Sequence, residues 1–358
     1  MLFRDLFKEI GRVKEDSFYK NSNVIIRLNT LFKVLTAKLK DEKIKTSTLE
    51  EICNNLIKIV NLSLSGKRNE AFNLLYTTYF KDESISRLDI KDYNAGKKAF
   101  YRMRNSQEYV QYENHEMYHI PFDKNYLVGN ERFSITGFPT LYLSSSIYGC
   151  WEETGRGNLE YANVALFKNT QKIKLISLIA PSNRATVQNN NILLAFPLLL
   201  ASSLEVVHPR EKFIPEYIVP QLLMECLIEY RNQNATTDIL GIEYKSVHRN
   251  KRDLMFNERD KTDIFINYAI PPFDYKSEGG ICPKLMEIFE YWNSVSWAKL
   301  QYERPNAFIN IVENGQKRYS VSRFGLMEKY LNLRDPKMLT YTTSRIGGIP
   351  EGALTFQN

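Results

Sequence analysis

The sequence predicts an α+β fold with an N-terminal helical domain, and three observations support this class. Apolar residues recur at helical spacing through residues 1–92, short β-rich runs begin near Asp92, and these runs mix irregularly with helical stretches. Because 358 residues exceed the size at which one hydrophobic core stops growing, we expect more than one unit. We therefore divide the chain into a helical domain (1–92), a β-rich domain (93–280) and a C-terminal extension (281–358) that packs on the β-rich domain.

The helical domain shows start and stop signals as well as periodicity. Asn23 precedes a broad apolar stripe over 24–35, and such a residue is a good helix N-cap. The segment 47–50, Ser-Thr-Leu-Glu, has the form of a capping box and predicts a second helix. Gly66 is a stop signal, and 68–80 predicts a third amphipathic helix.

The β-rich domain alternates short apolar runs with helical stretches. The runs are rich in β-branched and aromatic residues, which favour strands. Their irregular order predicts a mixed sheet. The expected strands are 117–122, 140–143, 164–168, 173–179, 239–247 and 264–270, and the expected helices are 147–154, 191–207 and 217–232.

The charge is mildly positive: 48 Lys and Arg against 41 Asp and Glu give a formal net charge of +7. Such an excess suits an anionic small molecule, an acidic partner protein or weak nucleic-acid contact. The basic runs are short, and aromatic residues are not interleaved with arginine in a way that indicates base stacking. We therefore find no strong nucleic-acid signal.

Cysteine usage and hydropathy indicate a cytoplasmic protein. The four cysteines are far apart and form no metal-ligand pair, as expected for reduced core thiols. We see no signal peptide at the N-terminus. The longest apolar run, 192–201, is far shorter than the roughly 20 residues that a membrane helix needs, so we expect no membrane association.

One zinc-peptidase-like motif, His115-Glu-Met-Tyr-His119, needs separate treatment. The HExxH pattern binds zinc only on a helix, where both histidines share one face. Here Ile120 and Pro121 follow at once, and proline disfavours helical geometry at the residue before it. We interpret the motif as a strand entry and predict no metal. The chain also lacks the glycine-rich dinucleotide and P-loop motifs.

Polar and aromatic residues of catalytic type are concentrated in a set of short blocks. Their order and spacing carry the functional interpretation. The blocks are Tyr101-Arg102, Glu131-Arg132-Phe133-Ser134, Leu141-Tyr142-Leu143, Trp151-Glu152-Glu153 and Gly241-Ile242-Glu243-Tyr244-Lys245-Ser246.

These blocks resemble the RES domain family, named for Arg, Glu and Ser, over about 99–272. Tyr142 lies 9 residues before Trp151 and 11 before Glu153, as in the family pattern. The resemblance implies that Arg102, Tyr142, Glu153 and Ser246 occupy the functional positions, and that 93–280 is a RES-like catalytic domain with a mixed-sheet core similar to ADP-ribosyltransferases.

The resemblance also implies an activity. Known family members include toxins that consume NAD⁺, so we expect cleavage of the nicotinamide–ribose bond by phosphorolysis or hydrolysis, with a toxic or defensive effect. Inorganic phosphate is a possible co-substrate, with Arg104 or Arg132 as its subsite, and no other cofactor is expected. A cognate antitoxin or immunity protein is the expected partner. A protein ADP-ribosyltransferase is the alternative, and a non-catalytic nucleotide- or partner-binding module is the alternative of another class.

The chemistry of NAD⁺ assigns a role to each predicted residue. Breaking the glycosidic bond develops positive charge on the ribose, which the Glu153 carboxylate can stabilise. Arg102 can hold a phosphate through two hydrogen bonds. Tyr142 can stack on the nicotinamide ring, and Ser246 can hold the carboxamide or a ribose hydroxyl.

Two assignments stay open in the sequence. Arg132 is either a second phosphate contact or part of a structural ion pair. Glu152 competes with Glu153, because adjacent helical residues point about 100° apart and only one of them can face a pocket. The spacing to Tyr142 favours Glu153.

Overall fold

The computed structural model describes residues 2–108, 110, 112–182, 185–187, 190–246, 263–274, 280–303, 319 and 322–333. Within these residues, one eight-stranded sheet forms the centre of the molecule, with the order β1-β5-β6-β7-β3-β2-β4-β8. Only β5 and β6 pair in parallel, and the other neighbours are antiparallel, so the sheet is mixed as predicted. The strands are β1 (Ile90–Tyr93), β2 (Phe100–Arg104), β3 (Leu141–Ser144), β4 (Asn163–Asn169), β5 (Ile173–Leu178), β6 (Ile239–Lys245), β7 (Ile266–Ile270) and β8 (Phe289–Val295).

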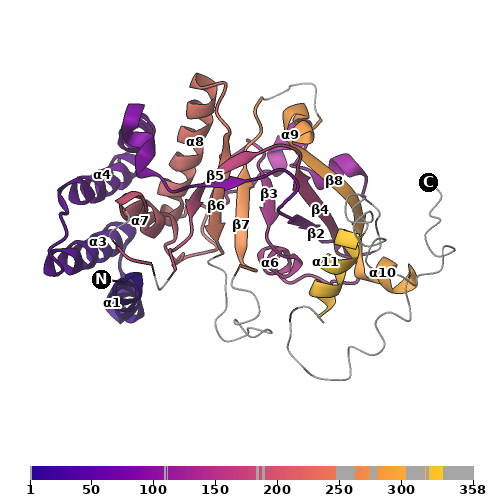
Figure 1. The fold of residues 1–358 in the computed structure, drawn as a ribbon, viewed down its shortest axis with the longest axis horizontal. Coiled ribbons are helices and arrows are strands. Elements are labelled where there is room, and N and C mark those ends of the chain that lie inside the picture. The colour runs from indigo at the N-terminus through magenta and orange to yellow at the C-terminus, as the bar shows by residue number, and fades with distance from the viewer. Residues whose placement is uncertain are drawn as a thin grey trace.

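Two later helices lie between the N-terminal helices and the sheet. Figure 1 shows α7 (Asn190–Ser202) and α8 (Ile218–Gln233) between the N-terminal helices and the β5–β6 part of the sheet. One hydrophobic core runs through all three layers. The N-terminal helices are α1 (Phe3–Glu15), α2 (Ser17–Asn21), α3 (Val24–Asp41), α4 (Ser47–Leu64) and α5 (Arg68–Tyr79).

The predicted capping residues are partly correct. Asn23 caps α3, because its side chain accepts a hydrogen bond from the N–H of Ile26. The capping box predicted at 47–50 is wrong by one residue: Thr46 is the N-cap of α4, and its hydroxyl donates to the Glu50 carboxylate. Gly66 ends this region with φ of +76°, a conformation that glycine adopts without strain.

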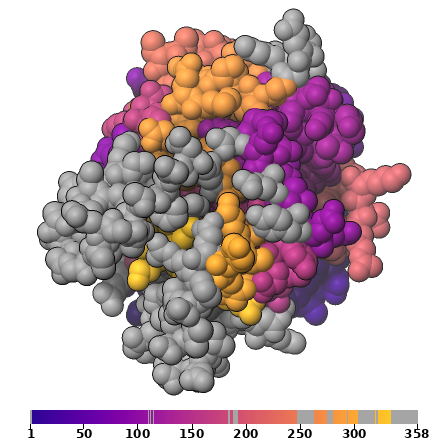
Figure 2. Space-filling view, turned by 90° about the vertical axis from the view of Figure 1, so that its right-hand side faces the viewer, coloured from indigo at the N-terminus to yellow at the C-terminus, as the bar shows by residue number. Residues whose placement is uncertain are grey.

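The other end of the sheet is covered by short helices from the middle and the end of the chain. They are α6 (Ile147–Glu153), α9 (Pro283–Ile288), α10 (Trp297–Glu303) and α11 (Arg323–Leu333). A second core cluster joins α6, α10 and α11 to β2 and β4. Figure 2 views this side, where orange and yellow C-terminal segments lie at the surface beside purple segments from around residue 100.

Most of the predicted elements are present, with one clear error. Strands occur at the expected places for β3 to β7, and helices for α6 to α8. The strand predicted at 117–122 is wrong, because this segment runs between the 3₁₀ helices η2 (Asn114–Met117) and η3 (Phe122–Leu127). Two further 3₁₀ helices are η1 (Asp82–Arg87) and η4 (Pro215–Tyr217). Strands β1, β2 and β8 and helices α9 and α10 had not been predicted, whereas α1 lies in the region that was expected to be helical.

Two further features bear on the sequence interpretation. All four cysteines are buried and free. Among the described residues, every helix is too short or too polar to cross a lipid bilayer.

Candidate active site

A cavity of about 320 Å³ opens where β2 and β3 meet. Four of the five predicted site residues line it, namely Arg102, Arg132, Tyr142 and Glu153. The fifth, Ser246, contacts the cavity through Glu153. The structure therefore brings side chains from distant parts of residues 93–280 to one cavity, whose volume lies within the range typical of small-molecule sites.

The short pairing between β2 and β3 leaves space for the cavity between these strands. In the described residues, these strands share one residue pair, Tyr101 opposite Ser144. The main-chain carbonyl of Tyr142 lies beyond this pair and accepts a hydrogen bond from Arg102 Nη1 at 2.7 Å instead. The arginine side chain therefore takes the place of a strand partner at this point of the sheet.

Arg102 is a half-buried cation that lacks an anionic partner among the described residues. Its Nε has no hydrogen-bond partner, and among the described residues no carboxylate lies within ion-pair distance of its guanidinium. Burial, with a contribution from the nearby Arg104, lowers the pKa of Arg102 to about 10, so the group stays charged at neutral pH. A desolvated charge is costly unless a counter-charge approaches it, which makes this guanidinium suited to binding an anion.

Glu153 is the last residue of α6 and is exposed to the cavity. Its carboxylate accepts a hydrogen bond from the hydroxyl of Ser246, which directly follows β6. The neighbouring Glu152 points elsewhere and pairs with Arg156 at 2.9 Å. Of the two adjacent carboxylates, Glu153 is thus the one that lines the cavity.

Tyr142 presents a hydroxyl that has no hydrogen-bond partner, although Ser134 is a polar neighbour. Burial raises the pKa of Tyr142 well above its ordinary value, so the hydroxyl keeps its proton and remains a donor. An unpaired buried hydroxyl in a cavity is a candidate ligand contact.

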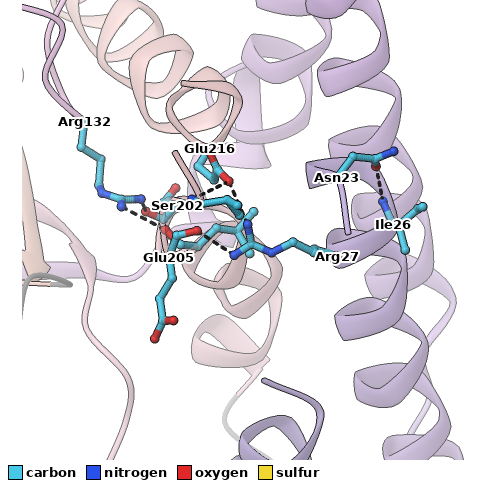
Figure 3. A network of polar contacts seen from close by, with 9 residues as sticks. Asn23, Ile26, Arg27, Arg132, Ser202, Glu205 and Glu216 are labelled. Carbon is cyan, nitrogen blue, oxygen red and sulfur yellow. Dashed lines mark hydrogen bonds and ion pairs between the residues drawn. The ribbon is translucent and has the colours of Figure 1, made fainter. Parts of the chain in front are cut away.

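Arg132 is engaged with the main chain rather than with a carboxylate. Its two terminal nitrogens donate to the carbonyls of Ser202 and Leu204, each at 2.9 Å, at the end of α7 (Figure 3). Its guanidinium lies over the ring of Tyr217 with 5.0 Å to the ring centre. Arg132 was expected to be either a second phosphate contact or part of a structural ion pair. In place of an ion pair it makes these carbonyl contacts, which hold the end of α7 in the cavity wall.

The same end of α7 is held from its other side by the N-terminal helices. Arg27 of α3 forms a buried ion pair with Glu216 at 2.8 Å and donates to the carbonyl of Glu205 at 2.7 Å (Figure 3). Glu216 precedes Tyr217, the residue beneath Arg132. The helical domain therefore contacts the segment that forms one wall of the cavity.

The HExxH motif does not build a metal site. His119 is buried, its Nε2 accepts the N–H of Cys282 at 2.9 Å, and its Nδ1 is bonded to the carbonyl of Ile120. His115 is exposed and pairs with Glu113. Among the described residues, no group of three or more potential ligands could hold a metal ion. Both ring nitrogens of His119 are thus engaged, and the bond of Nε2 joins this segment to Cys282 at the start of α9.

Several cavity residues had not been singled out in the sequence. Tyr244 lies in the block quoted from β6, and its ring packs on Phe133. Thr140 begins the expected strand 140–143 beside the Tyr142 block, and Tyr217 carries no recognisable signal, since it is one aromatic residue in an ordinary segment. Asn267 had a usable signal, because it is the polar residue in an otherwise apolar strand run. Arg104, considered for a phosphate subsite, has its guanidinium over the ring of Tyr112 and is absent from the cavity lining.

Comparison with known proteins identifies a family and a relative. The RES domain family model matches residues 99–276, and the chain belongs to this family. It is 28% identical over 320 residues, or 80% of this chain and 69% of the relative, to a Bacillus subtilis (strain 168) protein named "Putative toxin YopC". No solved structure matches the chain. The expected similarity of the core to ADP-ribosyltransferases therefore remains a prediction.

Proposed function

We propose that this protein is an NAD⁺-consuming toxin or defence effector that cleaves the nicotinamide–ribose bond. One observation carries the proposal: a half-buried arginine that has no carboxylate partner among the described residues, Arg102, and an exposed carboxylate, Glu153, line the same cavity. NAD⁺ offers the complementary groups, an anionic diphosphate and a ribose carbon that becomes positive as its bond to nicotinamide breaks. The RES family and the toxin-named relative support a toxic effect.

The cleavage step needs little from the protein beyond charge and position. The bond between ribose C1′ and the nicotinamide nitrogen breaks, and its electron pair leaves with nicotinamide, which becomes neutral. Glu153 stabilises the positive charge that develops on the ribose. The hydrogen bond from Ser246 holds the carboxylate in place, so little reorganisation is needed during the reaction.

Arg102 and Tyr142 are proposed to bind the dinucleotide. The unpaired Nε of Arg102 can donate to a phosphate while Nη1 stays bonded to the Tyr142 carbonyl. The unpaired Tyr142 hydroxyl can donate to a ribose or nicotinamide oxygen. Both contacts would give hydrogen-bond partners to buried polar groups that now lack them, which contributes to affinity.

The acceptor of the ribosyl group is phosphate or water. In phosphorolysis a phosphate oxygen forms the new bond to C1′, and in hydrolysis a water oxygen does so and releases its proton. Neither Arg104 nor Arg132 is placed as a ready phosphate subsite, since one covers Tyr112 and the other has both terminal nitrogens bonded to carbonyls. A cognate antitoxin or immunity protein that covers the cavity is the proposed partner.

The test is incubation of the purified protein with NAD⁺ alone and with inorganic phosphate, followed by chromatography of the products. We expect free nicotinamide without any added protein substrate. Stimulation by phosphate identifies phosphorolysis, and its absence identifies hydrolysis. Nicotinamide release only with an acceptor protein would replace this proposal with protein ADP-ribosylation. Binding of NAD⁺ without any release would indicate a non-catalytic module.

A further inference from the structure

Asn267 is a buried amide in the cavity wall, and among the described residues neither of its polar side-chain atoms has a hydrogen-bond partner. It lies in β7, opposite Ser144 of β3 and Tyr244 of β6, and is 3% exposed. Both its Nδ2 and its Oδ1 are buried without a partner, and the residue lines the same cavity as Arg102 and Glu153.

Such an amide is costly in an empty site. A buried donor or acceptor without a partner loses its hydration without compensation, and most buried polar groups are therefore paired. Asn163 of β4, which is equally buried, shows the ordinary arrangement: its Nδ2 donates to the carbonyls of Val110 at 2.8 Å and Tyr161 at 3.2 Å. The contrast indicates that Asn267 is kept for a bound molecule.

The chemistry of the side chain limits what that molecule can present. An asparagine amide offers one acceptor and one donor group side by side, and a primary carboxamide offers the complementary donor and acceptor. A carboxylate offers acceptors only, so it would satisfy Nδ2 but face the lone pairs of Oδ1. Of the other unpaired groups in the cavity lining, the hydroxyls of Thr140 and Tyr142 are neutral, whereas the Nε of Arg102 is cationic and is assigned above to a phosphate.

We propose that Asn267 recognises the carboxamide of the nicotinamide group and thereby selects NAD⁺ over its acid analogue, nicotinic acid adenine dinucleotide. This inference rests on the proposed function, because it assigns a specificity-determining residue to that reaction. It adds a reason for the substrate choice: a site that pairs both amide atoms rejects a ligand that leaves one of them unpaired.

The test compares both dinucleotides with wild type, Asn267→Leu and the matched control Asn163→Leu. For wild type we expect a preference for NAD⁺ of about 10- to 100-fold in kcat/KM, as for a buried hydrogen-bonding group left unpaired by the wrong ligand. Asn267→Leu should lower kcat/KM for NAD⁺ by about the same factor, change that for the acid analogue by less than about 3-fold, and so abolish the preference. The control Asn163→Leu, if active, should keep the wild-type preference for NAD⁺.

Thermal unfolding accompanies the kinetics. Replacing an unpaired amide with an apolar group of similar size should leave the Tm of Asn267→Leu equal or higher, whereas Asn163→Leu should lower it because two hydrogen bonds are lost. If Asn267→Leu does not fold, Asn267→Ala replaces it in the same comparison. An equal loss of kcat/KM for both dinucleotides, an unchanged preference, or a wild-type preference for the acid analogue overturns the assignment.

Calorimetric binding of nicotinamide and nicotinic acid separates this inference from the proposed function. If wild type releases no nicotinamide from NAD⁺ but binds nicotinamide more tightly than nicotinic acid, and Asn267→Leu loses that difference, cleavage is refuted and the recognition stands. If wild type cleaves NAD⁺ and neither binding nor preference depends on Asn267, the recognition is refuted and cleavage stands. No cleavage together with no binding refutes both.

Discussion

The hydroxyl of Ser246 donates a hydrogen bond to the carboxylate of Glu153, and this contact joins the end of β6 to the end of α6. Two residues that are 93 positions apart thus meet at one edge of the cavity. We had expected Ser246 to contact the ligand directly. Its observed partner makes it a positioning residue for Glu153, and its role in binding NAD⁺ remains a prediction.

Removing the Ser246 hydroxyl should impair turnover more than binding. In Ser246→Ala the Glu153 carboxylate loses the group that orients it, and we expect kcat for nicotinamide release to fall about 10- to 100-fold with KM changed by less than about 3-fold. Steady-state kinetics measures both. A rise in KM at constant kcat would instead place Ser246 in direct contact with the substrate.

Arg102 should determine the affinity for the dinucleotide. Arg102→Met removes the cation from the cavity lining and should raise the Kd for NAD⁺ at least about 10-fold, as expected for a charge-assisted hydrogen bond. Arg102→Lys should recover only part of the loss, because a lysine lacks the fork that holds the Tyr142 carbonyl and a phosphate together. Calorimetry with NAD⁺ measures both effects. Wild-type affinity in Arg102→Met would contradict the claim that Arg102 binds the dinucleotide.

The ion pair of Arg27 and Glu216 should stabilise the contact between α3 and the cavity wall. Both side chains are almost fully buried, so Arg27→Met leaves a buried carboxylate unpaired and should cost about 3–5 kcal/mol of unfolding free energy. Arg27→Met/Glu216→Leu should cost less than Arg27→Met alone, because no unpaired charge remains. Urea denaturation measures both variants. A double variant less stable than the single variant would contradict this account.

His119 should make the stability depend on acid pH. Burial, opposed by the bond to the Ile120 carbonyl, lowers the pKa of His119 to about 4, below its unfolded value of 6.5. Between these values the unfolded chain binds more protons than the folded one, so stability falls as the pH is lowered from about 6.5 to about 4. The full loss corresponds to about 3 kcal/mol.

A matched variant isolates this contribution from the other titrating groups. His119→Gln keeps a group that can accept the Cys282 N–H but does not titrate in this range. Urea denaturation at pH 7 and pH 4.5 should show a smaller difference for His119→Gln than for wild type. Equal pH dependence in the two proteins would contradict the assignment to His119.

The sequence allowed much of this site to be predicted because its key residues occupy short blocks with fixed spacing. Tyr142 and Glu153 are close in the chain, so the strand and helix that carry them could be located from local patterns. Tyr217 reaches the cavity because η4 packs beneath Arg132, and such placement depends on tertiary structure and leaves little local signal. Asn267 stands out as the polar residue of an apolar run, but its approach to the cavity depends on long-range strand pairing.

The errors have physical causes as well. The run 117–122 has the apolar composition of a strand, but buried contacts of Tyr118 and His119 with distant main-chain groups fix it between two 3₁₀ helices. Strands β1 and β2 were missed because charged residues interrupt them. The charged residue Arg102 is compatible with strand β2 because its side chain lines the cavity.

The most direct test of the central claim compares Glu153→Gln with Glu152→Gln. The two residues are adjacent on α6, but Glu153 lines the cavity and Glu152 pairs with Arg156. With NAD⁺ as substrate, we expect nicotinamide release to fall about 100-fold or more in Glu153→Gln, since an amide cannot stabilise the developing charge, and to stay within about 3-fold of wild type in Glu152→Gln. Equal activity in wild type and in a folded Glu153→Gln would contradict the claim that this carboxylate cleaves NAD⁺.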